Sequence, residues 1–103
     1  MIVSKIVFSD EELQKDFDNL SENDPIKKGI RKAIIEIQNN PYCGRNVKKK
    51  LIPKKYNELN NLWIYNLPSS WRLIYSLAPN EIEILAVVLD WMDHKDYEHL
   101  FNF

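Results

Sequence analysis

The sequence has one cysteine and only two glycines among its 103 residues. A single cysteine cannot form a disulfide within the chain, and we therefore expect a cytoplasmic protein. Cys43 stands between Tyr42 and Gly44 with no activating base nearby, which favours a plain loop residue over a nucleophile. Two isolated glycines, Gly29 and Gly44, also exclude a glycine-rich phosphate-binding loop.

Long apolar segments are missing too. No apolar run approaches the ~20 residues that a membrane-spanning helix needs. The first residues lack the apolar stretch and small-residue cleavage site of a signal peptide. The length is that of a single domain over residues 1–103 with one modest core, and we expect no membrane association.

Metal-binding patterns are also absent from the sequence. The two histidines, His94 and His99, are five positions apart, and this spacing on a helix does not place them on one face. The chain has neither a cysteine pair nor a His-Glu-x-x-His pattern. We therefore expect neither a metal nor another cofactor.

Charge is nearly balanced overall but unevenly distributed. Residues 1–26 carry two lysines against seven acidic residues, and residues 73–103 carry one lysine against six, so each end has a net charge of −5. Residues 27–72 carry eleven basic residues against two acidic ones, a net charge of +9. A basic middle segment of this kind is typical of proteins that bind polyanions, although any one lysine is more simply a solvated surface residue. The candidate nucleic-acid-binding residues are Arg45, Lys48, Lys49, Lys50, Lys54 and Lys55.

The stretch from Leu62 to Trp91 predicts a three-stranded antiparallel meander. Two runs rich in Trp, Tyr and Ile surround Leu67-Pro68-Ser69-Ser70, which is a hairpin turn signal. A second turn is expected at Ala78-Pro79-Asn80, before the apolar run that ends at Leu89. A strand that is apolar on both faces belongs in the middle of a sheet.

The remaining elements complete an α+β fold. We expect an N-terminal strand over Ile2–Phe8 and a helix over Asp10–Leu20, with Ser9 and Glu12 as a capping box. A second helix begins at Asp24-Pro25 and ends at Asn39-Asn40-Pro41. A lysine-rich edge strand over Val47–Ile52 would make the antiparallel sheet four-stranded. We place the helix pair on one face of the sheet and a short helix, capped by Asp93, at the C-terminus.

Arg72 is an unusual residue in an apolar strand. Alternation places it with Ile74 and Ser76 on the face opposite Trp71 and Leu73. A guanidinium in such a strand needs a partner, which is either an acidic side chain of the protein or a bound anion. The sequence leaves these two alternatives open.

Arg72, the lysines at 48–55, His94 and Tyr97 form a candidate catalytic set. Arginine and lysine bind phosphate, while histidine and tyrosine transfer protons. Together they could cleave RNA by activating a 2′-hydroxyl against the neighbouring phosphodiester. Each of these residues also has a purely structural explanation.

Several segments resemble the RelE/ParE toxin superfamily of toxin–antitoxin systems. They are Trp71-Arg72-Leu73-Ile74-Tyr75, the strand Ile82 to Leu89 and the ending Asp90-Trp91-Met92-Asp93-His94-Lys95-Asp96-Tyr97. Lys50–Tyr56 and Asn61-Leu62-Trp63 are similar to a RelE-like subgroup. The resemblance extends over nearly the whole chain. Two departures are a short interval between His94 and Tyr97 and an acidic context around Lys95.

The resemblance implies a RelE-like toxin, a ribosome-dependent mRNA endonuclease that a cognate antitoxin neutralises. Its partners would be that antitoxin and mRNA on the ribosome. Arg72 would contact the scissile phosphate, and His94 or Tyr97 would be the acid–base residue. Because the superfamily also contains members that poison gyrase, the alternative is a non-catalytic module of the same fold that binds an antitoxin or gyrase.

Overall fold

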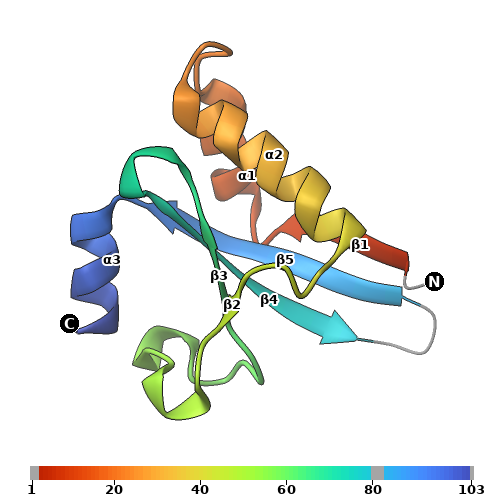
Figure 1. Cartoon of the computed structure of the whole chain (residues 1–103), viewed down its shortest axis with the longest axis vertical. Coiled ribbons are helices and arrows are strands. Elements are labelled where there is room, and N and C mark those ends of the chain that lie inside the picture. Colours follow the sequence, from red (N-terminus) through yellow and green to blue (C-terminus); the bar gives the residue numbers. More distant parts are fainter. Residues whose placement is uncertain (1–2, 80–82, 103) are drawn as a thin grey trace.

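The computed structural model of the chain describes residues 3–79 and 83–102, and its centre is a five-stranded sheet (Figure 1). The strand order is β1-β5-β4-β3-β2. The strands are β1 (Val3–Phe8), β2 (Arg45–Asn46), β3 (Trp63–Asn66), β4 (Arg72–Pro79) and β5 (Glu83–Met92). The α+β class, the N-terminal strand and the meander of β3, β4 and β5 are confirmed. β2 to β5 form the antiparallel sheet, and β1 joins it as a fifth strand, parallel to β5.

The turn between β3 and β4 has the predicted composition. Pro68–Ser70 form one turn of 3₁₀ helix, and Ser69 and Ser70 have positive φ angles of 57° and 64°. The Leu67 N–H donates to the Trp71 carbonyl at 2.9 Å and closes the hairpin. The turn expected at Ala78-Pro79-Asn80 lies partly outside the described residues.

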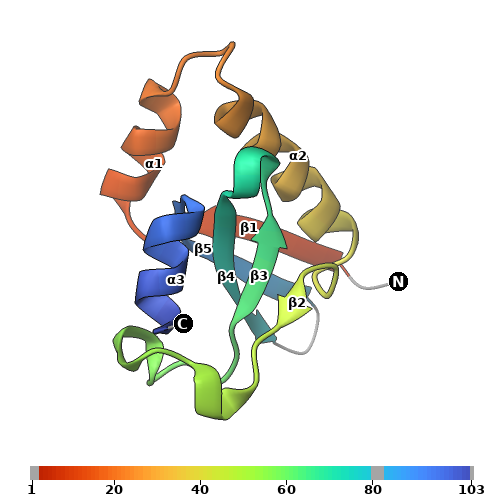
Figure 2. The ribbon, with the colours of Figure 1, turned by 60° about the vertical axis from the view of Figure 1, so that its left-hand side comes forward.

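Two helices cover one face of the sheet, α1 (Glu11–Asn19) and α2 (Pro25–Asn39) (Figure 2). The predicted cap of α1 is wrong by one residue. The Ser9 N–H still pairs with the Val88 carbonyl at 2.8 Å, as if β1 continued, so the helix begins after Asp10. The Asp10 carboxylate accepts from the Leu13 N–H at 2.8 Å. Asp24 caps α2 as predicted and accepts from the Ile26 N–H at 2.9 Å.

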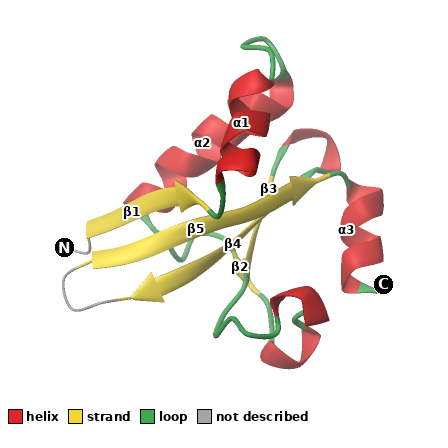
Figure 3. Ribbon diagram, turned by 180° about the vertical axis from the view of Figure 1, so that it is seen from behind, coloured by secondary structure: helices red, strands yellow, loops and turns green. Residues whose placement is uncertain are grey.

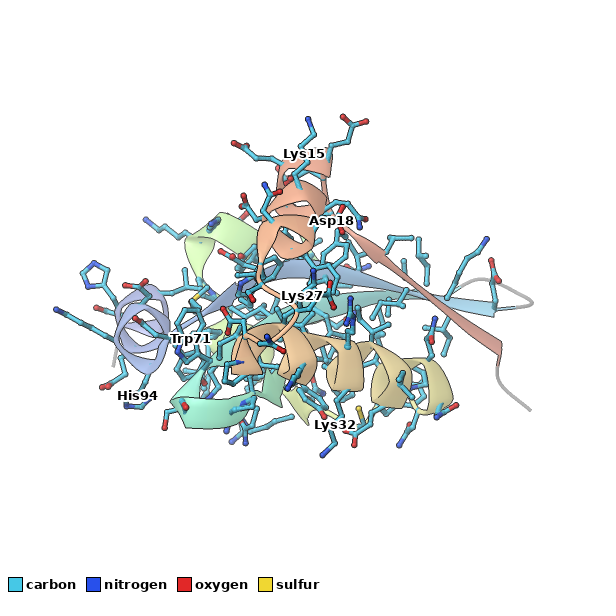
Figure 4. All side chains as sticks on the ribbon, turned by 90° about the horizontal axis from the view of Figure 1, so that it is seen from above. Lys15, Asp18, Lys27, Lys32, Trp71 and His94 are labelled. Carbon is cyan, nitrogen blue, oxygen red and sulfur yellow. The ribbon has the colours of Figure 1, made fainter. Side chains whose placement is uncertain are left out.

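Lys27 joins the two helices from a buried position. Lysine is a residue type that is usually exposed, yet Lys27 is only 3% exposed. Its ammonium donates to the carbonyls of Asp18 and Leu20, where α1 ends, and lies 2.9 Å from a Glu22 carboxylate oxygen. In the view from above, Lys27 lies between α1 and α2 (Figure 4). Lys27 therefore satisfies carbonyls that a helix end leaves without partners.

The opposite face is covered by residues 47–62 and by α3 (His94–Phe101), as the view from behind shows (Figure 3). Our prediction of an edge strand over Val47–Ile52 is wrong: the chain leaves the sheet after Asn46 and forms a 3₁₀ turn over Lys49–Leu51. A second 3₁₀ turn follows over Lys54–Tyr56. In a strand, the lysines could not all point away from the sheet. The turns leave the lysines exposed while Val47, Ile52 and Leu59 pack on the sheet.

None of α1, α2 and α3 has the length and apolar character that a bilayer crossing requires. The three Trp side chains are partly buried and pack against the core. Trp91 contacts Phe8 and Phe17 edge-on, with ring centroids 6.1 and 6.5 Å apart, and Trp63 stacks on Tyr75 at 6.2 Å. These aromatic contacts add to the apolar burial between the sheet and the face that α1 and α2 cover.

Gly29 lies where α2 meets the β3–β4 turn, and this position predicts an unusual response to alanine. A Cβ at Gly29 would lie 2.5 Å from Cδ of Pro68, whose ring cannot rotate away. Alanine improves helix propensity by ~1 kcal/mol, but overpacking of this kind costs ~1–3 kcal/mol. We expect Gly29→Ala to lower the melting temperature, measured by circular dichroism. Lys28→Ala, at the exposed neighbouring position, is the control and should change it little. A more stable Gly29→Ala protein would show that the two elements do not pack this closely.

Candidate functional site

Arg72 is the first residue of β4. It lies on the sheet face opposite Leu73, as alternation predicted, and this face is covered by residues 47–62 and α3, which we call the second layer. It pairs with Asn66 of β3 and Met92 of β5. The guanidinium lies over the ring of Tyr97, with its Cζ 5.4 Å from the ring centroid, and Nη1 donates to the Trp71 carbonyl at 3.1 Å. Within the described residues Arg72 makes no salt bridge, and its buried Nε has no hydrogen-bond partner. Of the two alternatives that the sequence left open for Arg72, the acidic side chain is therefore not found among the residues that the structure describes.

Tyr97 lies between two guanidinium groups. Helix α3 is capped by Asp93, which accepts from the Asp96 N–H at 2.9 Å, and it turns Tyr97 toward the sheet, where it is 5% exposed. The Tyr97 hydroxyl accepts a hydrogen bond from Nη2 of Arg45 at 2.6 Å. Arg72 lies under the ring of the same tyrosine. An aromatic face attracts a cation, and a charged donor strengthens the bond to the hydroxyl.

His94 is placed differently from Tyr97, although the two are three residues apart. It is the first residue of α3, and its exposed side chain lies with Nε2 2.6 Å from a carboxylate oxygen of Glu98. Unlike Tyr97, which is buried, His94 is exposed at the start of α3. The two predicted acid–base residues therefore occupy different environments, and Tyr97 is the one that contacts both arginines.

The six predicted nucleic-acid-binding residues are all exposed, and they fall into three groups. Arg45 and Lys48 line a hollow of about 370 Å³ together with Tyr97 and Phe101. Lys49, Lys50 and Lys54 lie on the 3₁₀ turns that follow. Lys55 is different, because its ammonium lies 5.5 Å from the Tyr56 ring centroid and it lines a second hollow beside Asp90. The exposed residues from Arg45 to Lys55, called the basic segment below, therefore begin at the hollow beside Tyr97, whereas Lys55 lines a different hollow.

Two contacts of this site could not have been found from the sequence. Arg45 and Tyr97 are 52 residues apart, and no spacing rule connects them. Phe101, whose ring centroid lies 4.9 Å from that of Tyr97, looks like an ordinary apolar residue of a terminal helix. For the contact between Arg45 and Tyr97, the only signal in the sequence was that each residue has charged or aromatic neighbours along the chain.

Other candidate centres are weaker. Cys43 lies in the loop after α2. Although the residue is largely exposed, partial burial of its thiol raises the Cys43 pKa, which opposes formation of the reactive thiolate. Between residues 3 and 102, leaving out 80–82, no three acidic, cysteine or histidine side chains are grouped as metal ligands. The cluster of Arg45, Arg72 and Tyr97 is the candidate site that the structure assembles.

A comparison with known families gives a match that covers most of the chain. The model of the family described as ParE toxin of type II toxin-antitoxin system, parDE, matches residues 7–90, which is most of the chain. The match confirms the predicted resemblance to the RelE/ParE superfamily. No curated protein matches the chain.

The burial of Tyr97 predicts a graded response to its replacement. Tyr97→Phe keeps the ring over Arg72 and loses the bond from Arg45, so we expect a loss of about 1 kcal/mol in the free energy of unfolding. Tyr97→Ala also removes the ring and should cost about 3–5 kcal/mol. Urea denaturation of both variants tests this order. Equal losses in the free energy of unfolding for Tyr97→Phe and Tyr97→Ala would mean that the ring does not pack on the sheet.

Proposed function

The chain belongs to the family of ParE toxins of type II toxin–antitoxin systems, and from this premise we propose that it is a toxin that cleaves mRNA on the ribosome. A toxin of such a system has a cognate antitoxin as its protein partner. The observation that carries the proposal is the position of Tyr97, with Arg45 bonded to its hydroxyl and Arg72 under its ring, beside a hollow on the basic segment. Two guanidinium groups on one tyrosine, one at its hydroxyl and one at its ring face, suit a phosphodiester substrate.

In the proposed reaction the 2′-oxygen of a ribose attacks the adjacent phosphorus and the bond from phosphorus to the 5′-oxygen breaks. The 2′-hydroxyl proton passes to a base, and the leaving 5′-oxygen takes a proton from an acid, leaving a cyclic phosphate and a 5′-hydroxyl end. Tyr97 and His94 are the proposed proton-transfer residues, and Tyr97 is the one in contact with both arginines. Arg72, with an unpaired Nε, and Arg45 would stabilise the charge that develops on the phosphate oxygens.

The basic segment is the proposed path of the RNA backbone. Arg45, Lys48, Lys49, Lys50 and Lys54 are exposed and can each neutralise a phosphate, which fixes position without reading sequence. Lys55, the sixth predicted residue, remains part of the proposal, although it is turned toward Asp90.

A second candidate function is inhibition of gyrase without RNA cleavage. It is favoured by the family match, because ParE-type toxins act on gyrase. It is also consistent with the burial of Tyr97, whose hydroxyl already has a partner in Arg45. Two assays on the same preparation separate the candidates: mapping of mRNA 5′ ends on programmed ribosomes, and supercoiling of relaxed plasmid by gyrase. Ribosome-dependent cleavage with unaffected supercoiling supports the proposal, and the reverse result overturns it.

Arg72 gives the sharpest test of the mechanism. A contact that strengthens in the transition state affects rate more than binding, and loss of one such group typically costs about 10²-fold. We expect Arg72→Ala to abolish toxicity in a growth assay while the protein still folds and still binds its antitoxin. Arg72→Lys should restore little, because an ammonium cannot replace the planar fork.

Lys95→Ala, an exposed charge change on α3, is the matched control and should stay toxic. Thermal denaturation runs beside the growth assay. A sharply lower melting temperature for Arg72→Ala would assign Arg72 to stability instead, and a folded, fully toxic variant would remove it from the mechanism.

The lysine segment is tested through salt. Changing Lys48, Lys49 and Lys50 to Ala together should weaken binding to single-stranded RNA without changing sequence preference. The logarithmic salt slope should fall by about 0.7 for each lost phosphate contact, or about 2 in all. Fluorescence anisotropy at several salt concentrations measures both quantities. Wild-type affinity and slope in the triple variant would exclude this segment from the RNA path.

A further inference from the structure

A second, acidic hollow lies where β1 turns into α1. The last pair between β1 and β5 is Phe8 with Val88, so β5 continues beyond its neighbour to Met92. The chain enters α1 beside this overhanging end and leaves a hollow of about 300 Å³. Its polar lining consists mainly of Asp10, Glu12, Asp16, Lys55, Tyr56 and Asp90. It shares no lining residue with the hollow beside Tyr97.

Asp90 is the half-buried carboxylate of this hollow. Its Oδ1 accepts from the Trp91 N–H at 2.9 Å, and it forms no salt bridge with another described residue. Burial raises the pKa of Asp90, and the charges of Asp10 and Asp16 raise it further, while Lys55 opposes them. A carboxylate in this position is stabilised by a cation that approaches from the hollow.

Tyr56 gives an independent indication of a missing partner. It is 7% exposed, it lines the same hollow, and its buried hydroxyl has no hydrogen-bond partner in the described part of the chain. Burial and the nearby charge of Asp90 raise the pKa of Tyr56 to about 12, so the hydroxyl keeps its proton. An unpaired buried hydroxyl is costly, and an incoming donor would remove that cost.

We propose that this hollow binds an arginine side chain of the cognate antitoxin. A guanidinium has five donors in a planar fork, so it can donate to the Asp90 carboxylate and to the Tyr56 oxygen together. Its flat apolar faces suit the walls formed by Leu13 and Leu89. The proposal rests on family membership and not on RNA cleavage, so either can fail without the other.

Lys55 would compete with that arginine for the negative charge of Asp90. Its ammonium lies over the Tyr56 ring and its charge acts on Asp90, but the side chain is exposed and able to move aside. Removing it should strengthen arginine binding, whereas removal of an RNA-binding lysine should weaken RNA binding. Replacing Lys55 therefore tests both roles: tighter binding of the arginine supports competition at Asp90, and weaker binding of RNA supports a phosphate contact.

The test uses N-acetyl-arginine amide as the probe and its neutral isostere N-acetyl-citrulline amide as the control. Both are titrated into the full-length chain, made by cell-free synthesis to avoid toxicity, and followed by ¹⁵N NMR. We expect the arginine probe alone to shift the resonances of Tyr56, Leu89, Asp90 and Trp91. Asp90→Asn and Tyr56→Phe should each weaken binding of the arginine probe about tenfold or more. Lys55→Gln should bind it more tightly.

Glu58→Gln is the control for net charge, since Glu58 is exposed and lies outside the hollow. Folding is checked in the same samples. Because burial raises the pKa of Asp90 above its unfolded value, its ionised form at neutral pH is destabilising, and Asp90→Asn should melt higher than wild type. A variant that is more stable yet binds less cannot be explained by unfolding.

The corresponding experiment on the complex replaces each arginine of the antitoxin by glutamine in turn. One replacement should weaken the complex with the wild-type toxin but not with Asp90→Asn. Equal shifts by the citrulline probe, tighter binding of Mg²⁺ than of the arginine probe, or unchanged binding by Asp90→Asn would each overturn the proposal. So would an antitoxin complex that is insensitive to every arginine replacement.

Discussion

The burial of β4 on both faces is the constraint on which the rest of the structure depends. Leu73, Ile74 and Tyr75 follow one another along this strand and all have zero exposed fraction, although neighbours in a strand point to opposite sides. Both faces of the sheet must therefore be covered. α1 and α2 cover the face of Leu73 and Tyr75, while residues 47–62 and α3 cover the face of Ile74.

The second layer is also what creates the candidate site. This layer is small, because it consists of two 3₁₀ turns and one helix of eight residues. Its helix, α3, lies against the start of β4, where Tyr97 contacts Arg72. Arg72 stands at that end and is half-buried, with Tyr97 of α3 packed on its guanidinium. β2 brings Arg45 to the hydroxyl of the same tyrosine. A core residue of the second layer, Tyr97, is thereby also in contact with two arginines.

The near-zero net charge of the chain conceals a basic stretch from Arg45 to Lys55 and an acidic group of residues around Asp90. The basic segment follows β2 and the 3₁₀ turns, whereas the acidic residues of α1 meet Asp90 at the overhanging end of β5. Lys55 is the one residue of the basic segment that also lines the acidic hollow. The proposed RNA path and the proposed arginine site therefore use different hollows of one small domain.

The sequence by itself determined the elements whose signals are local. Apolar spacing and the Asp24-Pro25 start defined α2, alternation assigned the faces of β4, and Asp93 marked the beginning of α3. Local signals misled where tertiary contacts compete. Residues 47–52 had strand composition but turn away, because a strand would press lysines against the sheet. The pairing of Arg45 with Tyr97, the burial of Lys27 and the hollow at Asp90 were decided only by the tertiary structure. Each brings together residues from different elements, and residue spacing along one element carries no record of such contacts.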